Sequence, residues 1–237
     1  MIHLKQIEHA FTLGRKGNER HVPVLKGIDL TVNSGEIVTL IGRSGSGKST
    51  LLHIVGGFIR PTSGTISIAS QDTTAYTEGQ WADFRRRHLG VVFQNFQLIP
   101  SMTAYENIEL PLVLQGTAPT VRRKLTLELM EQLGIAEYSD HYPSELSGGQ
   151  QQRVGIARSL ILNPPIVLAD EPTGSLDSEN EEQFLQLLKS LNRERKLTLL
   201  IITHDDKVAA IGHKTLRIED GRLLNQTDTR KLEVIHS

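Results

Sequence analysis

The sequence predicts an α/β protein in which a sheet carries a phosphate-binding loop, antiparallel strands lie at its edge, and a helical region is inserted between two strand-rich halves. Three observations predict this fold. A glycine-rich loop lies between an apolar strand and a helix at residues 42–50. A second apolar strand ends in the carboxylates of Asp170 and Glu171. Between these two motifs, over residues 95–144, strand patterns give way to helical spacing.

Composition narrows the class of protein. The 237 residues are 38% hydrophobic and 22% charged, which is ordinary for an α/β domain. The net charge of -1 provides no overall field for nucleic acid or an anionic bilayer, so we expect no nucleic-acid partner. The absence of cysteine excludes disulfides and thiolate metal sites and is compatible with a reducing cytoplasm. No run reaches the roughly 20 apolar residues of a transmembrane helix, and the N-terminus lacks a signal-peptide core, so we expect another chain to supply any membrane span.

The first third of the chain predicts mainly strands. Residues 2–11 and 22–32 alternate between apolar and polar side chains, which predicts two strands joined by a polar loop. We expect these strands to form an antiparallel edge beside the strand that precedes the glycine-rich loop. Residues 65–70 continue the pattern after a turn. Residues 80–87 predict a short basic helix, and residues 89–93 predict a buried strand that Gln94 closes.

The glycine-rich loop follows a strand at residues 37–41 and opens a helix at Lys48. Its spacing fits G-x-x-x-x-G-K-[ST], the P-loop pattern. Glycines at 42, 45 and 47 allow backbone torsions closed to other residues, so amide N–H groups can surround an anion at the helix N-terminus. Lys48 then supplies a charge for terminal phosphates, and the Ser49 hydroxyl can bind Mg²⁺. The residues expected at the phosphates are Gly42, Arg43, Ser44, Gly45, Ser46, Gly47, Lys48, Ser49 and Thr50.

Helical spacing dominates the middle of the chain. It covers residues 104–114 and 121–133, where leucines recur at every fourth position. The sequence Ser147-Gly148-Gly149-Gln150 then precedes an amphipathic helix over residues 151–162. Ser147 is suited to cap that helix, and the glycines would expose its first N–H groups. This pattern predicts either a second phosphate site without its own lysine or a capped helix start with a glycine hinge, and the residues alone do not decide between them.

The apolar strand at residues 166–169 ends in Asp170 and Glu171. Acids at the carboxyl end of a buried parallel strand lie where α/β sheets place their ligands; the less favoured alternative is a helix N-cap after the strand. Asp170 can hold Mg²⁺ directly or through water, and Glu171 can polarise an attacking water. Residues 196–203 predict the next strand, and His204 at its end is placed to reach a γ-phosphate.

Together these motifs resemble the ATP-binding subunits of ABC transporters over the chain from Ile2 to Leu223. The resemblance rests on the P-loop, Gln94, Leu146–Gln150, Ile166–Glu171, the Ser175-Leu176-Asp177 loop and His204. It implies that Gln94 contacts Mg²⁺ and senses a membrane partner, that Glu171 is the catalytic base, and that His204 is the switch histidine. It also implies that Ser147, Gly148, Gly149 and Gln150 close on ATP held by a second subunit, and it places Asp177 among the nucleotide-binding residues.

The resemblance further implies one ABC ATPase domain over residues 1–237, with a catalytic core (1–94 and 160–225), a helical signature subdomain (95–159) and a tail (226–237). The tail is either a short amphipathic helix or a frayed end. ATP and Mg²⁺ are the expected cofactors, and a head-to-tail homodimer with two ATP molecules between its subunits is the expected assembly. Phe11 stands where the family usually stacks adenine on a tyrosine. It keeps the aromatic face and loses the hydroxyl, so we expect weak purine selectivity.

Residues 91–112, 146–160 and 168–178 most resemble the group that serves macrolide exporters and lipoprotein-release systems, although bacitracin-type and septal transporters share these stretches. This implies an ATPase in the cytoplasm, peripheral on the inner face of the cell membrane, that powers a transmembrane permease for export or extraction of lipophilic or peptide cargo. Residues 94–106 are the expected docking surface, because Phe96, Leu98, Ile99 and Met102 are more apolar than a free loop needs; the alternative is that they pack inside the insert.

Two other classes of ATPase have related motifs but differ from this chain. DNA-repair and chromosome-maintenance ATPases separate the same motifs with long coiled coils or zinc modules, whereas this chain has a compact insert and no cysteine. Translation-factor ATPases carry two such cassettes in one chain, and this chain has one.

Overall fold

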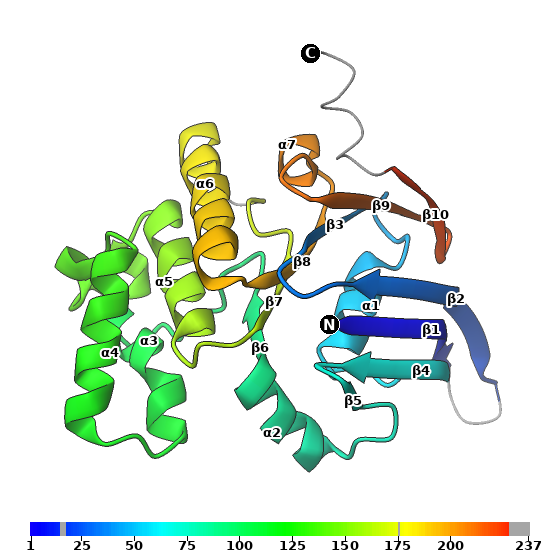
Figure 1. Ribbon diagram of the computed structural model, residues 1–237, viewed down its shortest axis with the longest axis horizontal. Helices are drawn as coiled ribbons and strands as arrows, with labels where there is room; N and C mark the ends of the chain where they lie inside the picture. The colour runs from blue at the N-terminus through cyan, green and yellow to red at the C-terminus, as the bar shows by residue number, and fades with distance from the viewer. Residues whose placement is uncertain (15–17, 175, 228–237) are drawn as a thin grey trace.

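The computed structural model describes residues 1–14, 18–174 and 176–227, which form two sheets and a lobe of helices (Figure 1). The four-stranded sheet has the order β2-β1-β4-β5, with β1 (Ile2–Leu13), β2 (Arg20–Val32), β4 (Ser63–Ile68) and β5 (Gln71–Asp72). The six-stranded sheet has the order β10-β9-β3-β8-β7-β6. Its strands are β3 (Ile37–Ile41), β6 (Leu89–Val92), β7 (Ile166–Asp170), β8 (Thr198–Thr203), β9 (Lys214–Glu219) and β10 (Arg222–Thr227).

The predicted N-terminal strands are antiparallel, but they form a sheet of their own. The P-loop strand β3 has β8 on one side and β9 on the other, so it has no free edge to which β1 or β2 could bond. The two sheets instead share an apolar core that includes helix α1 (Lys48–Val55). The expectation that these strands would lie directly beside β3 was therefore wrong, because both edges of β3 are already occupied.

Strands β3, β6, β7 and β8 run parallel and are buried on both faces, which explains their continuous apolar sequences. The pairing of Ile41 with Thr203, and of Asp170 with Ile202, brings three strand ends to one edge. Loops that follow β3, β7 and β8 therefore meet, although they are far apart in sequence.

The helical lobe contains α3 (Ala104–Leu114), α4 (Pro119–Gln132) and α5 (Gly148–Leu160), at the left of Figure 1. The bounds of α3 are those that its spacing predicts, and a capping box of Thr103 with Glu106 begins it. Helix α4 begins two residues before its predicted start, because a proline suits the first helical position. Short 3-10 turns at Ala136–Tyr138 and Pro143–Glu145 connect α4 to α5. The apolar face of α5 joins this lobe to β6 and β7 in a single core.

Several elements were not predicted. The basic helix α2 (Glu78–His88) was expected, but α6 (Ser178–Arg195), α7 (Asp206–Ala209), β9 and β10 were not. Apolar positions 184, 188 and 191 follow helical spacing and would have indicated α6. Strand β10 includes residues 226–227, which the sequence placed in a tail, and residues 228–237 lie outside the described part. Among the described residues, no helix combines the length and apolar character that crossing a bilayer requires.

Candidate active site

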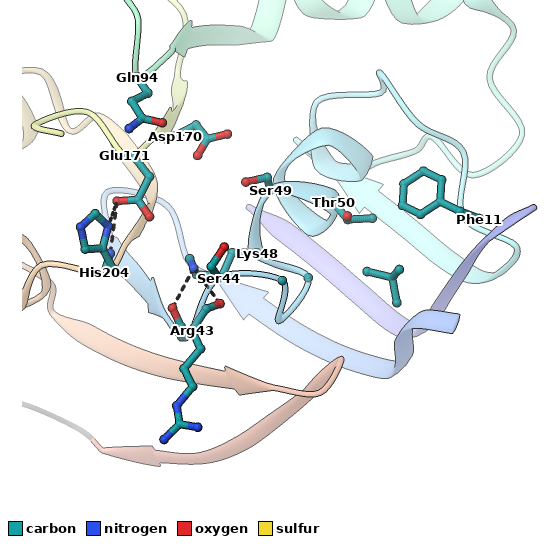
Figure 2. Close-up of a pocket in the computed structure, with 14 residues that line it drawn as sticks. Phe11, Arg43, Ser44, Lys48, Ser49, Thr50, Gln94, Asp170, Glu171 and His204 are labelled. Atoms are coloured by element: carbon teal, nitrogen blue, oxygen red, sulfur yellow. Dashed lines mark hydrogen bonds and ion pairs between the residues drawn. The ribbon is translucent and has the colours of Figure 1, made fainter. Parts of the chain in front are cut away.

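A cleft of about 720 Å³ lies at the edge where β3, β7 and β8 end (Figure 2). Its wall contains most of the predicted site residues, namely Phe11, Gly42, Arg43, Ser44, Gly45, Gly47, Lys48, Ser49, Thr50, Gln94, Asp170, Glu171 and His204. Val24 also lines the cleft and was not predicted. It occupies an extra position of β2 opposite the His9–Ala10 step, and a bulge of this kind re-aims a side chain.

The glycines of the loop serve two different purposes. Gly45 and Gly47 have φ values of 78° and 106°, which are left-handed torsions that other residues adopt rarely. Gly42 lacks such a torsion, contrary to expectation. It is required for close packing, because a Cβ there would clash with the carbonyl oxygen of Ile218. The loop thus lies tightly against β9 and turns its open face to the cleft.

Lys48 is the cation at the centre of the loop. Its side chain is only 8% exposed, and its Nζ donates to the carbonyl oxygens of Gly42 at 2.7 Å and Arg43 at 3.2 Å. Carbonyl dipoles compensate a buried ammonium only in part, and a phosphate oxygen would supply a full opposite charge. The loop and its lysine therefore fit a polyphosphate.

Ser46 is the one loop residue that does not line the cleft. Its side chain is buried beneath the loop beside Gly42, and its Oγ has no hydrogen-bond partner in the described part of the chain. Its backbone bonds to Arg43 and to Gly221. The expected contribution of Ser46 to phosphate binding is therefore not carried by its side chain.

Asp170 lies opposite Ser49 in the cleft (Figure 2). Burial raises the pKa of Asp170 and the neighbouring Glu171 raises it further, whereas His53, Ser49 and Lys48 oppose the rise. Mg²⁺ is usually held by one or two carboxylates together with substrate phosphates and water. A hydroxyl and a carboxylate facing each other beside a polyphosphate loop fit this ion.

Glu171 and His204 form a pair at the mouth of the cleft, shown by dashed lines in Figure 2. The His204 Nδ1 lies 2.8 Å from Glu171 Oε2, and the His204 backbone N–H donates to the same oxygen at 3.2 Å. Glu171 has a left-handed φ of 44°, held by a bond from its N–H to Ile202. Strained backbone of this kind clusters at functional sites. The two bonds from His204 therefore orient one carboxylate oxygen, and the other, Oε1, points away from His204 (Figure 2).

The predicted signature residues Ser147, Gly148, Gly149 and Gln150, together with Asp177, lie outside this cleft. Ser147 caps α5 in a capping box with Gln150, as its position predicted. Asp177 caps α6 by accepting from the Asn180 backbone N–H at 2.9 Å.

A Cβ on Gly149 would clash with the Asn180 side chain, so the start of α5 adjoins the start of α6. Asn180 was missed by the sequence analysis, and Ser175 lies outside the described residues. One chain thus carries two separate groups of residues. One is the P-loop cleft, and the other is the signature cluster, defined as Ser147, Gly148, Gly149 and Gln150.

Comparison with known proteins decides the family. Residues 25–174 match the model of the ABC transporter family. The chain belongs to the ABC transporter family. Within it, this chain is an ATP-binding subunit and an ATPase. The fold class and the resemblance seen in the sequence are thereby confirmed.

Among its ABC relatives, the chain is 55% identical to the ABC transporter ATP-binding protein YtrE of Bacillus subtilis, covering 94% of this chain and 96% of the relative. It is 44% identical to the lipoprotein-releasing system ATP-binding protein LolD of Geobacter metallireducens, over 90% and 95%. It is 45% identical to the macrolide export ATP-binding/permease protein MacB of Syntrophobacter fumaroxidans, over 93% of this chain and 31% of that longer protein.

A solved ABC cassette has the same fold. It is MJ0796 of Methanocaldococcus jannaschii, a dimer in a post-hydrolysis state bound to ADP and Pi. The two chains are 40% identical and superpose with a TM-score of 0.88 over 96% of this chain and 98% of that one.

Proposed function

We propose that this subunit binds ATP with Mg²⁺ in the cleft and pairs head to tail with a second copy around two ATP molecules. Hydrolysis then drives a transmembrane permease from the inner, cytoplasmic face of the membrane. The observation that carries the proposal is that one cleft contains the P-loop, Asp170 and the Glu171–His204 pair. Lipophilic or peptide cargo, exported or extracted from the membrane, is proposed from the likeness to LolD and MacB.

In binding, the loop N–H groups and the N-terminus of α1 take the phosphates. Lys48 exchanges its two carbonyl partners for terminal phosphate oxygens. Phe11 lines the same cleft and offers an aromatic face to the base, and Val24 adds an apolar contact.

The metal site of the proposal is made by Ser49, Asp170 and Gln94. All three line the cleft, and Ser49 faces Asp170 there. Mg²⁺ bound there would neutralise charge that develops on the transferred phosphoryl group. Asp170 must be ionised to contribute, so its raised pKa places a lower limit on the pH of full activity.

For hydrolysis, Glu171 Oε1 accepts the proton of a water whose oxygen attacks the γ-phosphorus, while the bond from γ-phosphorus to the bridging oxygen breaks and ADP leaves. His204 binds Oε2 through its ring and its backbone, which fixes the carboxylate plane. The His204 ring is mostly exposed, so it can turn to contact the γ-phosphate. His204 thus links the base to the phosphate that it acts on.

The dimer follows from the separation of the two sites in one chain. The signature cluster at the N-terminus of α5 presents N–H groups but lies outside the P-loop cleft. A head-to-tail pair lets the cluster of each copy cover the ATP of the other. The solved dimer of MJ0796 bound to ADP and Pi supports this arrangement.

The test is Glu171→Gln. An amide cannot accept the proton, so we expect ATP hydrolysis to fall by at least about 100-fold while ATP binding is retained. Gel filtration with ATP and Mg²⁺ should show an accumulated dimer. Glu78→Gln, a change of the same type at an exposed glutamate of α2, serves as the control and should leave both measurements unaltered. Hydrolysis near the wild-type rate in Glu171→Gln would remove Glu171 from the role of base.

A further inference from the structure

His9 is a buried histidine on β1, next to the wall of the ATP cleft. It is only 9% exposed, and neither ring nitrogen has a hydrogen-bond partner among the described residues. A buried polar group without a partner costs stability relative to an apolar side chain of similar size. Folding alone therefore does not explain an imidazole at this position.

The ring of His9 contacts the ring of Phe11. The two centroids are 4.7 Å apart and the planes meet at 85°, the edge-to-face geometry that aromatic pairs favour. Side chains two residues apart on a strand share one face, so Ile7, His9 and Phe11 form a row from the core to the cleft. Ile7 is fully buried, whereas Phe11 is 40% exposed at the cleft.

We propose that His9 is a positioning residue that holds the Phe11 ring in the orientation that stacks on the base of the nucleotide. This rests on the proposed role of Phe11. A phenylalanine has no hydroxyl with which to anchor its ring, and an exposed side chain changes rotamer within picoseconds to nanoseconds. The contact with His9 raises the population of one rotamer before the nucleotide binds, and binding to a pre-populated conformer is tighter.

Both side chains of the contact, His9 and Phe11, are aromatic rings. An aliphatic side chain at position 9 would fill space but would lack the polarised ring edge or face that fixes the angle between the rings. His9 would therefore act on the base alone, and the phosphates, held by the loop and Lys48, would not respond to it.

The test compares ligands with and without a base, using ADP and pyrophosphate, which the ATPase does not consume. The variant is His9→Leu, with His9→Phe as the matched control that keeps an aromatic ring. We expect His9→Leu to raise the Kd for ADP about 2- to 10-fold, as the energy of one aromatic pair implies, and to leave the Kd for pyrophosphate unchanged. The KM for ATP should rise with kcat unaltered, and the melting temperature should not fall. His9→Phe should bind ADP like the wild type.

A double-mutant cycle with Phe11→Ala separates this inference from the function on which it rests. Phe11→Ala should weaken ADP binding, and adding His9→Leu to it should cause no further loss. An unchanged Kd for ADP in Phe11→Ala would overturn the stacking role of Phe11 itself. A weakened Phe11→Ala beside an unaffected His9→Leu would overturn the role of His9 alone.

Equal losses for ADP and pyrophosphate in His9→Leu would indicate a general distortion of the cleft and would also overturn the inference. His9→Gln, polar but not aromatic, repeats the test if His9→Leu does not fold, and normal ADP binding by it would count against the proposal.

Discussion

Single residues of the cleft are arranged at a cost to the nucleotide-free protein. Lys48 is buried against carbonyl oxygens, and Glu171 occupies a left-handed backbone conformation. Asp170 is a half-buried carboxylate next to a second acid. Active sites commonly retain such unfavourable features because they bind the ligand, so substitutions that remove them stabilise the protein while abolishing activity.

Asp170→Asn should stabilise the protein and abolish its activity. Burial raises the pKa of Asp170 above its ordinary value of 3.8, so the folded protein holds this proton more tightly than the unfolded chain does. The free energy of unfolding of the wild type therefore falls as pH rises through the window that starts near 3.8 and ends at the raised pKa. The Asn amide does not titrate, so Asp170→Asn does not lose this stability. We expect a higher melting temperature for the variant without nucleotide at neutral pH, by about 2–4 °C for each kcal/mol gained.

The measurement is thermal unfolding of both proteins across pH 4 to 8, in which the advantage of Asp170→Asn should shrink toward the acid end. The amide oxygen of the Asn side chain keeps an acceptor facing the Ser49 hydroxyl. A variant that melts below the wild type at neutral pH would show that Asp170 stabilises the empty cleft.

At the level of elements, part of the segment between β6 and α3, residues 93–103, packs inside the protein. Phe96 is buried and Leu98 packs against the core, so for these two residues the alternative of internal packing holds. Asn107 of α3, fully buried, bonds to both backbone groups of Ile99. The apolar residues left at least partly exposed for a membrane subunit are Ile99 and Met102 of this segment and Phe58, which is 48% exposed and has its ring centroid 6.5 Å from that of Phe93.

Phe58→Glu and Met102→Glu should each weaken co-purification with the membrane subunit by at least about tenfold, because a carboxylate in an apolar contact is left without a partner. Basal ATP hydrolysis should stay within about twofold of wild type, since neither side chain lines the cleft. Val121→Glu places the same charge on α4 at a residue that is also 48% exposed, and it should have no effect. Equal loss in all three variants would mean that charge alone, and not this surface, is responsible.

At the level of the whole molecule, the active site is expected to be shared between two copies. The P-loop cleft and the signature cluster are separate in one chain, and Gly149 has no room for a side chain beside Asn180. A substitution in the signature should therefore damage the site of the partner, whereas one in the P-loop damages the site of its own chain.

Mixing Lys48→Ala with Gly149→Asp should restore ATPase activity that neither variant has alone. In a hybrid dimer one site carries both defects and the other carries none, so an equal mixture leaves about a quarter of the wild-type sites intact. Activity should peak near equal proportions. Mixing Lys48→Ala with Glu171→Gln is the control, because both defects lie in the cleft of their own chain and no intact site can form.

Obligatory closure around two ATP molecules would also silence the hybrid, and a titration of Lys48→Ala into wild type detects this. Independent sites give a linear decline in activity, whereas closure that needs both ATP molecules follows the square of the wild-type fraction. No recovery together with a linear decline, once subunit exchange is confirmed, would contradict a shared site.

Local sequence patterns were enough to predict most of the residues that line the cleft. The P-loop, the acids after β7 and His204 each form a short contiguous pattern, because a phosphate or metal ligand set needs fixed residues at a turn that follows a strand. The bounds of α3 and the cap of α5 could also be predicted from local sequence, since capping and helical spacing act within a few residues.

Which of these patterns meet in space depends on how distant segments of the chain pack together. This packing placed β1 and β2 in a separate sheet, paired Glu171 with His204 across 33 residues, set Asn180 against Gly149, and put the β1 face with Phe11 at the cleft wall. Strand periodicity identifies the buried face of one strand but not its neighbours, which depend on how distant segments share a core. Long-range packing, rather than local preference, therefore placed the start of α5, with Ser147 to Gln150, outside the cleft.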